Sequence, residues 1–268
     1  MMTRRQILRT LAALAPAGIA STARAQSPPA QTAGIGPLDQ SVLPRGVRAR
    51  VVNNVNGIRM HVLEAGFETE RRPAVLLVHG FPELAYSWRK VIAPIAAAGY
   101  HVIAPDLRGY GRSGGTDVTF DDDLAPWRTL NEVTDMVALV SAFGYRSVAA
   151  VVGHDFGSPV AAWCAVMRPD VFRAVVLMSA PFAGPPALPF NTADAAAAMS
   201  TTSIGTVANA PADRIYDDLA NLTPPRKHYQ RYYSTREANE NMRHAPQGLH
   251  AFLRAYYHMK SADWKPNQ

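Results

Sequence analysis

The chain has 268 residues, of which 48% are hydrophobic and 18% are charged. This is an ordinary globular composition, and the chain is long enough to bury one large core. The formal net charge is +6, but Arg4, Arg5, Arg9 and Arg24 lie in a segment expected to be removed, which leaves +2. Such a charge gives no support to binding of nucleic acid or of a membrane surface. Cys164 is the single cysteine, which excludes an internal disulfide.

The first 25 residues have the pattern of a signal peptide. The pair Arg4-Arg5 precedes an apolar stretch, residues 11–20, and Ala23-Arg24-Ala25 supplies the small residues that a signal peptidase requires. The apolar stretch is too short to span a bilayer as a helix. We expect a twin-arginine signal at residues 1–25 and a periplasmic or secreted protein without stable membrane anchoring. The alternative is a basic amphipathic start that stays on the protein.

The next segments predict an α/β fold. Residues 26–46 are rich in Pro, Ala, Gly and Ser and are expected to form a flexible leader. A hairpin follows, because Asn56-Gly57 stands between two β-rich runs, 48–52 and 58–64. The expected strands after it are 74–79, 101–106, 147–152 and 172–179, and the expected helices are 87–98, 130–143 and 156–167. This alternation predicts a core over residues 47–181, with a mostly parallel sheet flanked by helices on both faces.

The alternation stops at Pro181. Residues 182–268 are helical or irregular in pattern, rich in tyrosine and polar residues, and contain no further apolar strand. We therefore expect them to form an inserted helical cap that is incomplete.

Asp155 stands at the centre of Gly153-His154-Asp155-Phe156-Gly157, between an expected buried strand and an expected helix. This context is typical of a nucleophile elbow, which holds the central side chain on a sharp turn above the sheet. The elbow usually presents serine. A carboxylate is already ionised at neutral pH, and it attacks saturated carbon in an epoxide or a carbon–halogen bond. The alternative is an aspartate in an ordinary turn that caps the following helix.

Hydrolysis of an ester formed on Asp155 needs water, a general base and an oxyanion hole. The segment His79-Gly80-Phe81-Pro82-Glu83 directly follows an expected strand. We expect the backbone N–H of Phe81 to join that of Phe156 in the oxyanion hole, where each donor stabilises the intermediate by roughly 3 kcal/mol. The ring of His79 is expected to bind nearby backbone, and His154 is expected to point away from Asp155, so neither is assigned as the base.

Residues 106–113, with the sequence Asp-Leu-Arg-Gly-Tyr-Gly-Arg-Ser, form a third block. They lack the Gly-Lys-Ser/Thr of a phosphate-binding P-loop. We expect Asp106 and Arg108 to form a structural ion-pair and hydrogen-bond network that holds this loop, without a catalytic step.

The order of the three blocks resembles the epoxide hydrolase branch of the α/β-hydrolase superfamily, over residues 47–268. The resemblance implies an Asp–His–acid triad and two cap tyrosines that donate hydrogen bonds to the epoxide oxygen. The segment 228–233 looks like the one that carries the first tyrosine, which makes Tyr229 that donor. Packing with a surface hydroxyl is the alternative for a tyrosine in such a helix. The implied reaction opens a small-molecule epoxide to a diol through an alkyl ester on Asp155, with no cofactor and no metal.

The sequence also departs from that family. The second tyrosine, the acid, the catalytic histidine and the last two core strands of the family lie beyond the end of this chain. The remaining histidines fall in the expected cap and none is assigned as the base: His228, His244, His250 and His258. The resemblance therefore indicates an epoxide hydrolase truncated at its C-terminus, which lacks the groups needed for full turnover.

Two other functions stay open. A haloalkane dehalogenase-like hydrolase would share the fold and the nucleophile, but that family usually places an indole N–H directly after the nucleophile, where Phe156 has no side-chain donor. A non-catalytic remnant would keep Asp155 but lose turnover. The sequence shows neither a set of metal ligands at suitable spacing nor a dinucleotide fingerprint, and it leaves the oligomeric state open.

Overall fold

The structure is a computed structural model of the chain, and it describes residues 35–115, 118–184 and 212–265. The signal peptide expected at residues 1–25 lies outside the described residues. The chain divides into two compact units. Unit 1 comprises residues 1–117 and 124–180, and unit 2 comprises residues 118–123 and 181–268.

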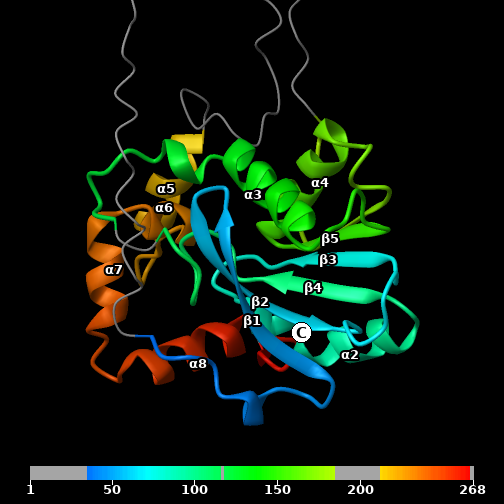
Figure 1. Cartoon of the computed structure of the whole chain (residues 1–268). Coiled ribbons are helices and arrows are strands. Elements are labelled where there is room, and N and C mark those ends of the chain that lie inside the picture. The colour runs from blue at the N-terminus through cyan, green and yellow to red at the C-terminus, as the bar shows by residue number, and fades with distance from the viewer. Residues whose placement is uncertain (1–34, 116–117, 185–211, 266–268) are drawn as a thin grey trace, which may run out of the picture. The chain divides into compact units, whose positions relative to one another are not determined.

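Unit 1 contains a six-stranded sheet with the order β1-β2-β4-β3-β5-β6 (Figure 1). Its strands are β1 (Val47–Val55), β2 (Ile58–Ala65), β3 (Ala74–Val78), β4 (His101–Pro105), β5 (Ala150–His154) and β6 (Val175–Met178). The β1–β2 and β2–β4 pairs are antiparallel, whereas β3–β4, β3–β5 and β5–β6 are parallel. The predicted mostly parallel sheet is therefore confirmed.

The hairpin between β1 and β2 turns at Asn56 and Gly57, as predicted. Both residues have left-handed backbone, with φ of 46° and 82°. A two-residue hairpin turn of this type requires positive φ at both central positions, which asparagine and glycine adopt readily.

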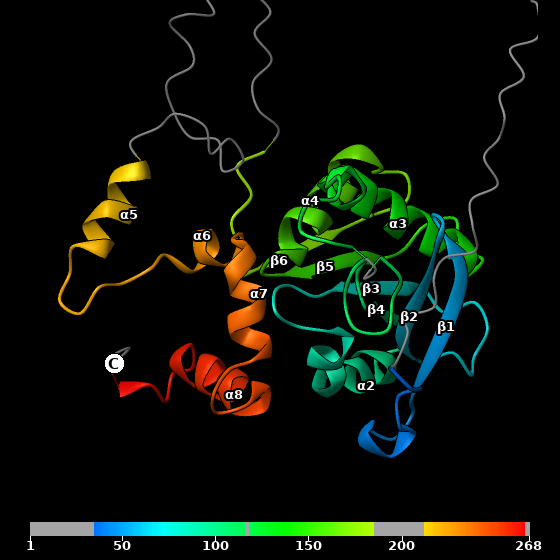
Figure 2. The ribbon, with the colours of Figure 1, turned by 90° about the vertical axis from the view of Figure 1, so that its left-hand side faces the viewer.

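Helices cover both faces of the sheet (Figures 1 and 2). On one face lie α3 (Thr129–Ala142) and α4 (Gly157–Met167), and on the other lie α2 (Arg89–Ala97) and the short 3-10 helix η2 (Ala85–Trp88). Two further 3-10 helices are η1 (Gln40–Val42) and η3 (Ala125–Trp127).

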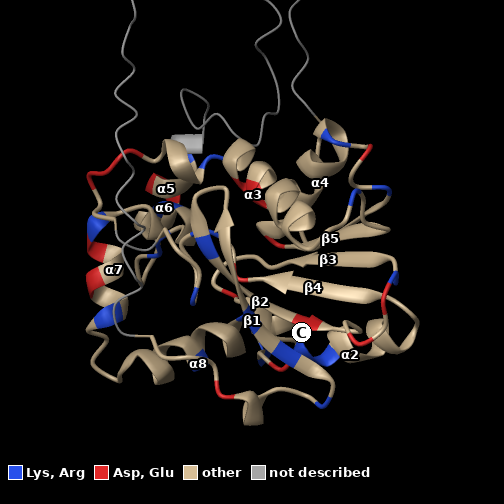
Figure 3. Ribbon diagram, viewed as in Figure 1, with Lys and Arg blue, Asp and Glu red and all other residues tan. Residues whose placement is uncertain are grey.

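Alternate residues of β3 pack into two separate hydrophobic cores, one on each face of the sheet. Ala74, Leu76 and Val78 pack in the cluster beneath α3 and α4, while Val75 and Leu77 pack in the cluster beneath α2. This is the period of two expected for a strand, and it explains why a strand buried on both faces reads as a continuous apolar run. The strand residues of β3, β4 and β5 include no Lys, Arg, Asp or Glu (Figure 3).

Two segments differ from the sequence-based expectation. The strand expected at residues 172–179 is shorter, and its four residues Val175–Met178 are 37–47% exposed, whereas the central strands are buried. Leu43, at the end of the segment expected to be a flexible leader, is buried in the cluster beneath α2. Burial of its apolar side chain fixes this end of the segment on the core.

The described part of unit 2 is helical. It contains α5 (Ala212–Ala220), α6 (Tyr229–Tyr233), α7 (Arg236–Arg243) and α8 (Leu249–Met259). Half of the residues of α7 are charged, with arginines at its two ends, Arg236 and Arg243, and glutamates between them, Glu237 and Glu240 (Figure 3). Among the described residues, no helix combines the length and the hydropathy that a membrane span requires.

Candidate active site

Asp155 lies on the sharp turn between β5 and α4. Its φ is +52°, a left-handed conformation that is uncommon for a residue other than glycine. Two close approaches hold the turn. A Cβ on Gly153 would overlap the backbone of Gly157, and a Cβ on Gly157 would overlap the carbonyl oxygen of Val78. The expected strand-to-helix elbow is thus present, with glycine at both positions where a side chain has no room.

Two backbone donors converge on one oxygen of the Asp155 carboxylate. The N–H of Phe81 donates to Oδ1 over 3.0 Å, and the N–H of Phe156 donates to the same oxygen over 2.7 Å. Among the described residues, no hydrogen-bond donor reaches Oδ2. The two carboxylate oxygens are therefore distinct: Oδ1 accepts two backbone hydrogen bonds, and Oδ2 accepts none from the described residues.

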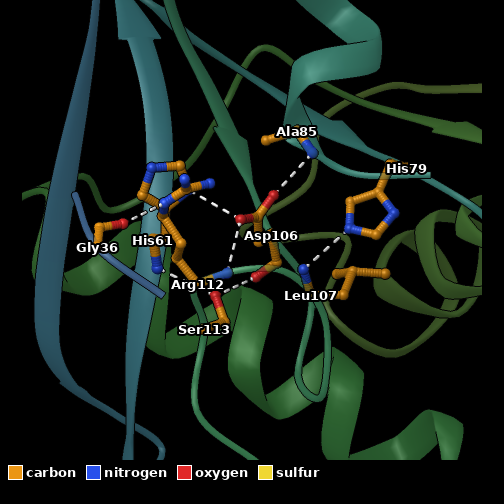
Figure 4. A network of polar contacts seen from close by, with 8 residues as sticks. All are labelled: Gly36, His61, His79, Ala85, Asp106, Leu107, Arg112 and Ser113. Carbon is orange, nitrogen blue, oxygen red and sulfur yellow. Dashed lines mark hydrogen bonds and ion pairs between the residues drawn. The ribbon is translucent and has the colours of Figure 1, made fainter. Parts of the chain in front are cut away.

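His79 shapes the loop that carries Phe81. Its ring is fully buried; the N–H of Leu107 donates to Nε2 over 3.0 Å, and Nδ1 lies 2.9 Å from the carbonyl oxygen of Gly80. Because Nε2 accepts a hydrogen bond, the proton of the neutral ring sits on Nδ1 and is donated to Gly80. Burial lowers the pKa of His79. The expectation that this ring binds backbone is confirmed (Figure 4).

The ring of His154 contacts residues other than Asp155. Its Nδ1 lies 3.0 Å from a carboxylate oxygen of Glu83, and its ring meets Trp88 edge-on at a centroid distance of 6.4 Å. Glu83 belongs to the same loop as Phe81, so this pair connects the elbow to the loop that supplies the first donor.

Asp106 is the hub of a buried network beside this loop (Figure 4). Its carboxylate accepts hydrogen bonds from the backbone N–H groups of Ala85 and Arg112, over 2.9 and 3.1 Å, and Oδ2 lies 2.9 Å from Nδ1 of His61. Burial alone would raise the pKa of Asp106, but the bonds from His61 and the backbone hold it below its usual value. This network connects β2, β4 and η2.

Arg108 does not join the Asp106 network, so the expected pairing of these two residues is wrong. Its guanidinium binds Asp135 of α3 with two contacts, of 2.6 Å to Oδ1 and 2.9 Å to Oδ2. Asn56 donates to the same carboxylate over 2.7 Å. The residues 106–113 therefore hold two structural networks, because Asp106 and Arg108 point to different elements.

Glu132 on α3 was not identified from the sequence. Burial, and then the charge of Asp135, raise the pKa of Glu132 to about 7. Burial also raises the pKa of Tyr110 to about 12, with smaller contributions from the charges of Glu132 and Asp155. Tyr110 meets His79 edge-on, with ring centroids 5.0 Å apart. The sequence pattern did not indicate that Glu132, an acidic residue in the first turn of an amphipathic helix, is half-buried.

The structure brings together three of the four predicted site residues, Asp155, Phe81 and Phe156, within unit 1. The fourth, Tyr229, begins α6 of unit 2 and is 42% exposed. Its ring stacks on His228 at 5.4 Å, and the Lys260 ammonium lies 4.7 Å from the ring centroid.

The histidines that were not assigned as a base, His228, His244, His250 and His258, all belong to unit 2. In unit 1, besides His79 and His154, His61 is bound to Asp106 and His101 is bound to Glu64. Among the described residues, no group of His, Cys, Asp and Glu could hold a metal ion.

Curated relatives of the chain include an epoxide hydrolase of Caballeronia sordidicola, 45% identical over 127 residues, which are 47% of this chain and 36% of that protein. Epoxide hydrolase B of Mycobacterium tuberculosis is 43% identical over 49% of this chain and 35% of its own length. Epoxide hydrolase 3 of Siraitia grosvenorii is 41% identical over 51% of this chain and 40% of its own. The chain thus spans well under half the length of the relatives it matches.

Solved structures similar to the chain include an epoxide hydrolase from an endophytic Streptomyces, with a TM-score of 0.46 and 46% identity over 52% of this chain and 39% of that one. The sequence model of the alpha/beta hydrolase fold matches residues 73–263. These residues include the elbow, the oxyanion-hole loop and the described helices of unit 2. The chain belongs to the alpha/beta hydrolase fold family, in which it resembles the epoxide hydrolases.

Proposed function

We propose that Asp155 is the nucleophile of an epoxide-opening reaction. The observation that carries the proposal is the unequal environment of its two carboxylate oxygens, with two backbone donors on Oδ1 and none of the described donors on Oδ2. Likeness to three epoxide hydrolases, each over about half of this chain, supports it.

In the first step, Oδ2 attacks a ring carbon of the epoxide. A bond forms between Oδ2 and that carbon, the carbon–oxygen bond of the strained ring breaks, and the epoxide oxygen takes a proton. We assign that proton to the Tyr229 hydroxyl, by resemblance. The product is a hydroxyalkyl ester of Asp155.

In the second step, water attacks Cγ of that ester. Negative charge then develops on Oδ1, where the N–H groups of Phe81 and Phe156 are already in place to stabilise it. A base takes one proton of the water, the bond between Cγ and Oδ2 breaks, and Oδ2 leaves as a hydroxyl of the diol after it takes that proton from the base. The carboxylic acid that remains on Asp155 then loses its proton, which returns to the Tyr229 oxygen. None of the described histidines of unit 1 is assigned as that base, because each is bound to another group.

The test is intact-mass spectrometry of the full chain after incubation with styrene oxide, a small aryl epoxide. We expect one covalent adduct, which is absent in Asp155→Asn. Asp170→Asn, at an exposed carboxylate, serves as the matched control and should keep the adduct. An adduct that survives in Asp155→Asn would contradict the proposal.

The same samples distinguish two forms of the function. A stable adduct without diol indicates that only the first step occurs in this chain. Repeated formation of diol that requires Asp155 indicates full turnover and a base supplied by the chain itself.

The dehalogenase alternative has less support. Phe156, the residue that follows the nucleophile, offers no side-chain hydrogen-bond donor for a departing halide, and its ring is 56% exposed. Incubation with 1-chlorohexane and measurement of free chloride tests this alternative directly.

A further inference from the structure

A pocket lies at the amino ends of the parallel strands, whereas Asp155 lies at their carboxyl ends. Its volume is about 590 Å³, and its lining includes Pro73, Ala149 and Arg173, which precede β3, β5 and β6. These three strands are parallel, so their amino ends share one edge, while Asp155 follows the carboxyl end of β5. The volume is in the range that holds a small-molecule ligand.

The lining of this pocket is basic. It includes three guanidinium groups, of Arg71, Arg72 and Arg173, and a single carboxylate, of Glu70. Arg72 donates to the carbonyl oxygen of Ala96 over 3.0 Å. In the described part of the chain, Arg71 and Arg173 form no ion pair. Two guanidinium forks without a carboxylate partner favour an anion with several oxygens, such as a sulfate or phosphate group.

The backbone of Arg71 has a conformation that is unfavourable for arginine. Its φ is +63°, in the left-handed region, where a residue with a Cβ is strained. Glycine or asparagine would fill the position without that strain, so the local fold gives no reason for an arginine here.

A buried chain of hydrogen bonds ends at the pocket. The carboxylate of Glu64, which is fully buried, lies 2.9 Å from Nε2 of His101, and Nδ1 of His101 lies 2.7 Å from the hydroxyl of Tyr145. Tyr145 lines the pocket. The other charged groups on Glu64 are Arg48, at 2.7 Å, and Arg50, at 3.8 Å.

This chain of bonds fixes one wall of the pocket. The Glu64 carboxylate accepts a hydrogen bond, so Nε2 of His101 carries a hydrogen. The bond between Nδ1 of His101 and the hydroxyl of Tyr145 holds the Tyr145 ring in place in the lining.

We propose that this pocket is a binding site for a small anion bearing a sulfate or phosphate group, held by Arg71 and Arg173. The site is separate from the epoxide chemistry and does not depend on it.

Isothermal titration of the full chain with sodium sulfate tests the site. Sulfate keeps its charge between pH 6 and pH 8, and sodium chloride at matched ionic strength in the cell removes the general salt effect. We expect one saturable site for sulfate.

Variants of the two arginines test the proposal. Arg71→Asn, which suits the left-handed backbone, and Arg173→Gln should each weaken sulfate binding about fivefold or more. Arg146→Gln, an exposed arginine that does not line the pocket, is the matched control and should bind like the parent. Thermal unfolding shows that each variant is folded.

Absence of saturable sulfate binding in the folded parent would overturn the proposal, and so would equal weakening in Arg146→Gln. A comparison with 4-nitrophenyl sulfate distinguishes a free anion from a monoester as the ligand.

Discussion

The backbone N–H of Phe81 lies 3.0 Å from Oδ1 of Asp155, although 74 positions separate the two residues in the sequence. The contact exists because β3 and β5 are parallel neighbours in the sheet, so that the loop after β3 meets the turn after β5. Together with the N–H of Phe156 it places two donors on one oxygen of the carboxylate. In the proposed reaction, donors that are already in place cost no reorganisation when charge develops on that oxygen.

Gly157→Ala should destabilise unit 1 by more than about 2 kcal/mol, because the added Cβ would overlap the carbonyl oxygens of Val78 and His79 in a tightly packed sheet. Urea unfolding followed by circular dichroism measures the loss. Gly36→Ala is the control, since a Cβ there meets no atom within 4 Å. Equal stability of the two variants would show that the elbow can relax.

Arg108→Gln should cost about 3 kcal/mol at pH 7, because it leaves the carboxylate of Asp135 buried without its charged partner. Burial already raises the pKa of Asp135, against the effect of Arg108, so the loss should shrink at low pH as Asp135 takes up a proton. Arg168→Gln removes an exposed pair with Asp170 and should leave stability nearly unchanged. A loss for Arg108→Gln no larger than that of this control would contradict the argument.

Glu132→Gln should stabilise the protein at pH 8 and change little at pH 4. Burial raises the pKa of Glu132 to about 7, so the folded state binds its proton more tightly than the unfolded state does. The contribution of Glu132 to the free energy of unfolding is therefore present below its ordinary pKa and is lost as the pH rises to about 7. This loss is at most about 3 kcal/mol. Urea midpoints of both proteins across this range measure the difference. A constant difference at all pH values would show that the effect is not electrostatic.

Val176→Lys should reduce concentration-dependent self-association, because β6 is the last strand of the described sheet and its four apolar residues are substantially exposed. A lysine on such an edge strand opposes pairing with another chain. Sedimentation velocity over a range of concentrations tests this. Val118→Lys adds the same charge at an equally exposed valine of unit 2 and should have no effect.

The sequence was sufficient for features that local pattern determines. The hairpin followed from Asn56-Gly57, and the buried strands followed from continuous apolar runs. The elbow was predicted from Gly153 and Gly157, which lie two positions before and after Asp155. The structure has no room for a side chain at either position. The alternation of strands and helices predicted a parallel sheet, but it did not predict the strand order, in which β4 stands between β2 and β3.

Other features depend on contacts between distant elements, and these could not be predicted. Arg108 binds Asp135, 27 positions away, rather than its neighbour Asp106, because the direction of each side chain is set by the tertiary fold. The burial of Glu132 and the arginine pocket at the amino ends of the strands arise in the same way. The exposure of β6 also contradicts the simple reading of an apolar run as a buried strand.

The most direct test of the central claim is tandem mass spectrometry of the protein after it reacts with styrene oxide. We predict that a peptide containing residues 153–157 carries the added mass as an ester on Asp155, and that mild base removes it. An adduct located on any other residue, such as a histidine or Cys164, would contradict the assignment of Asp155 as the nucleophile.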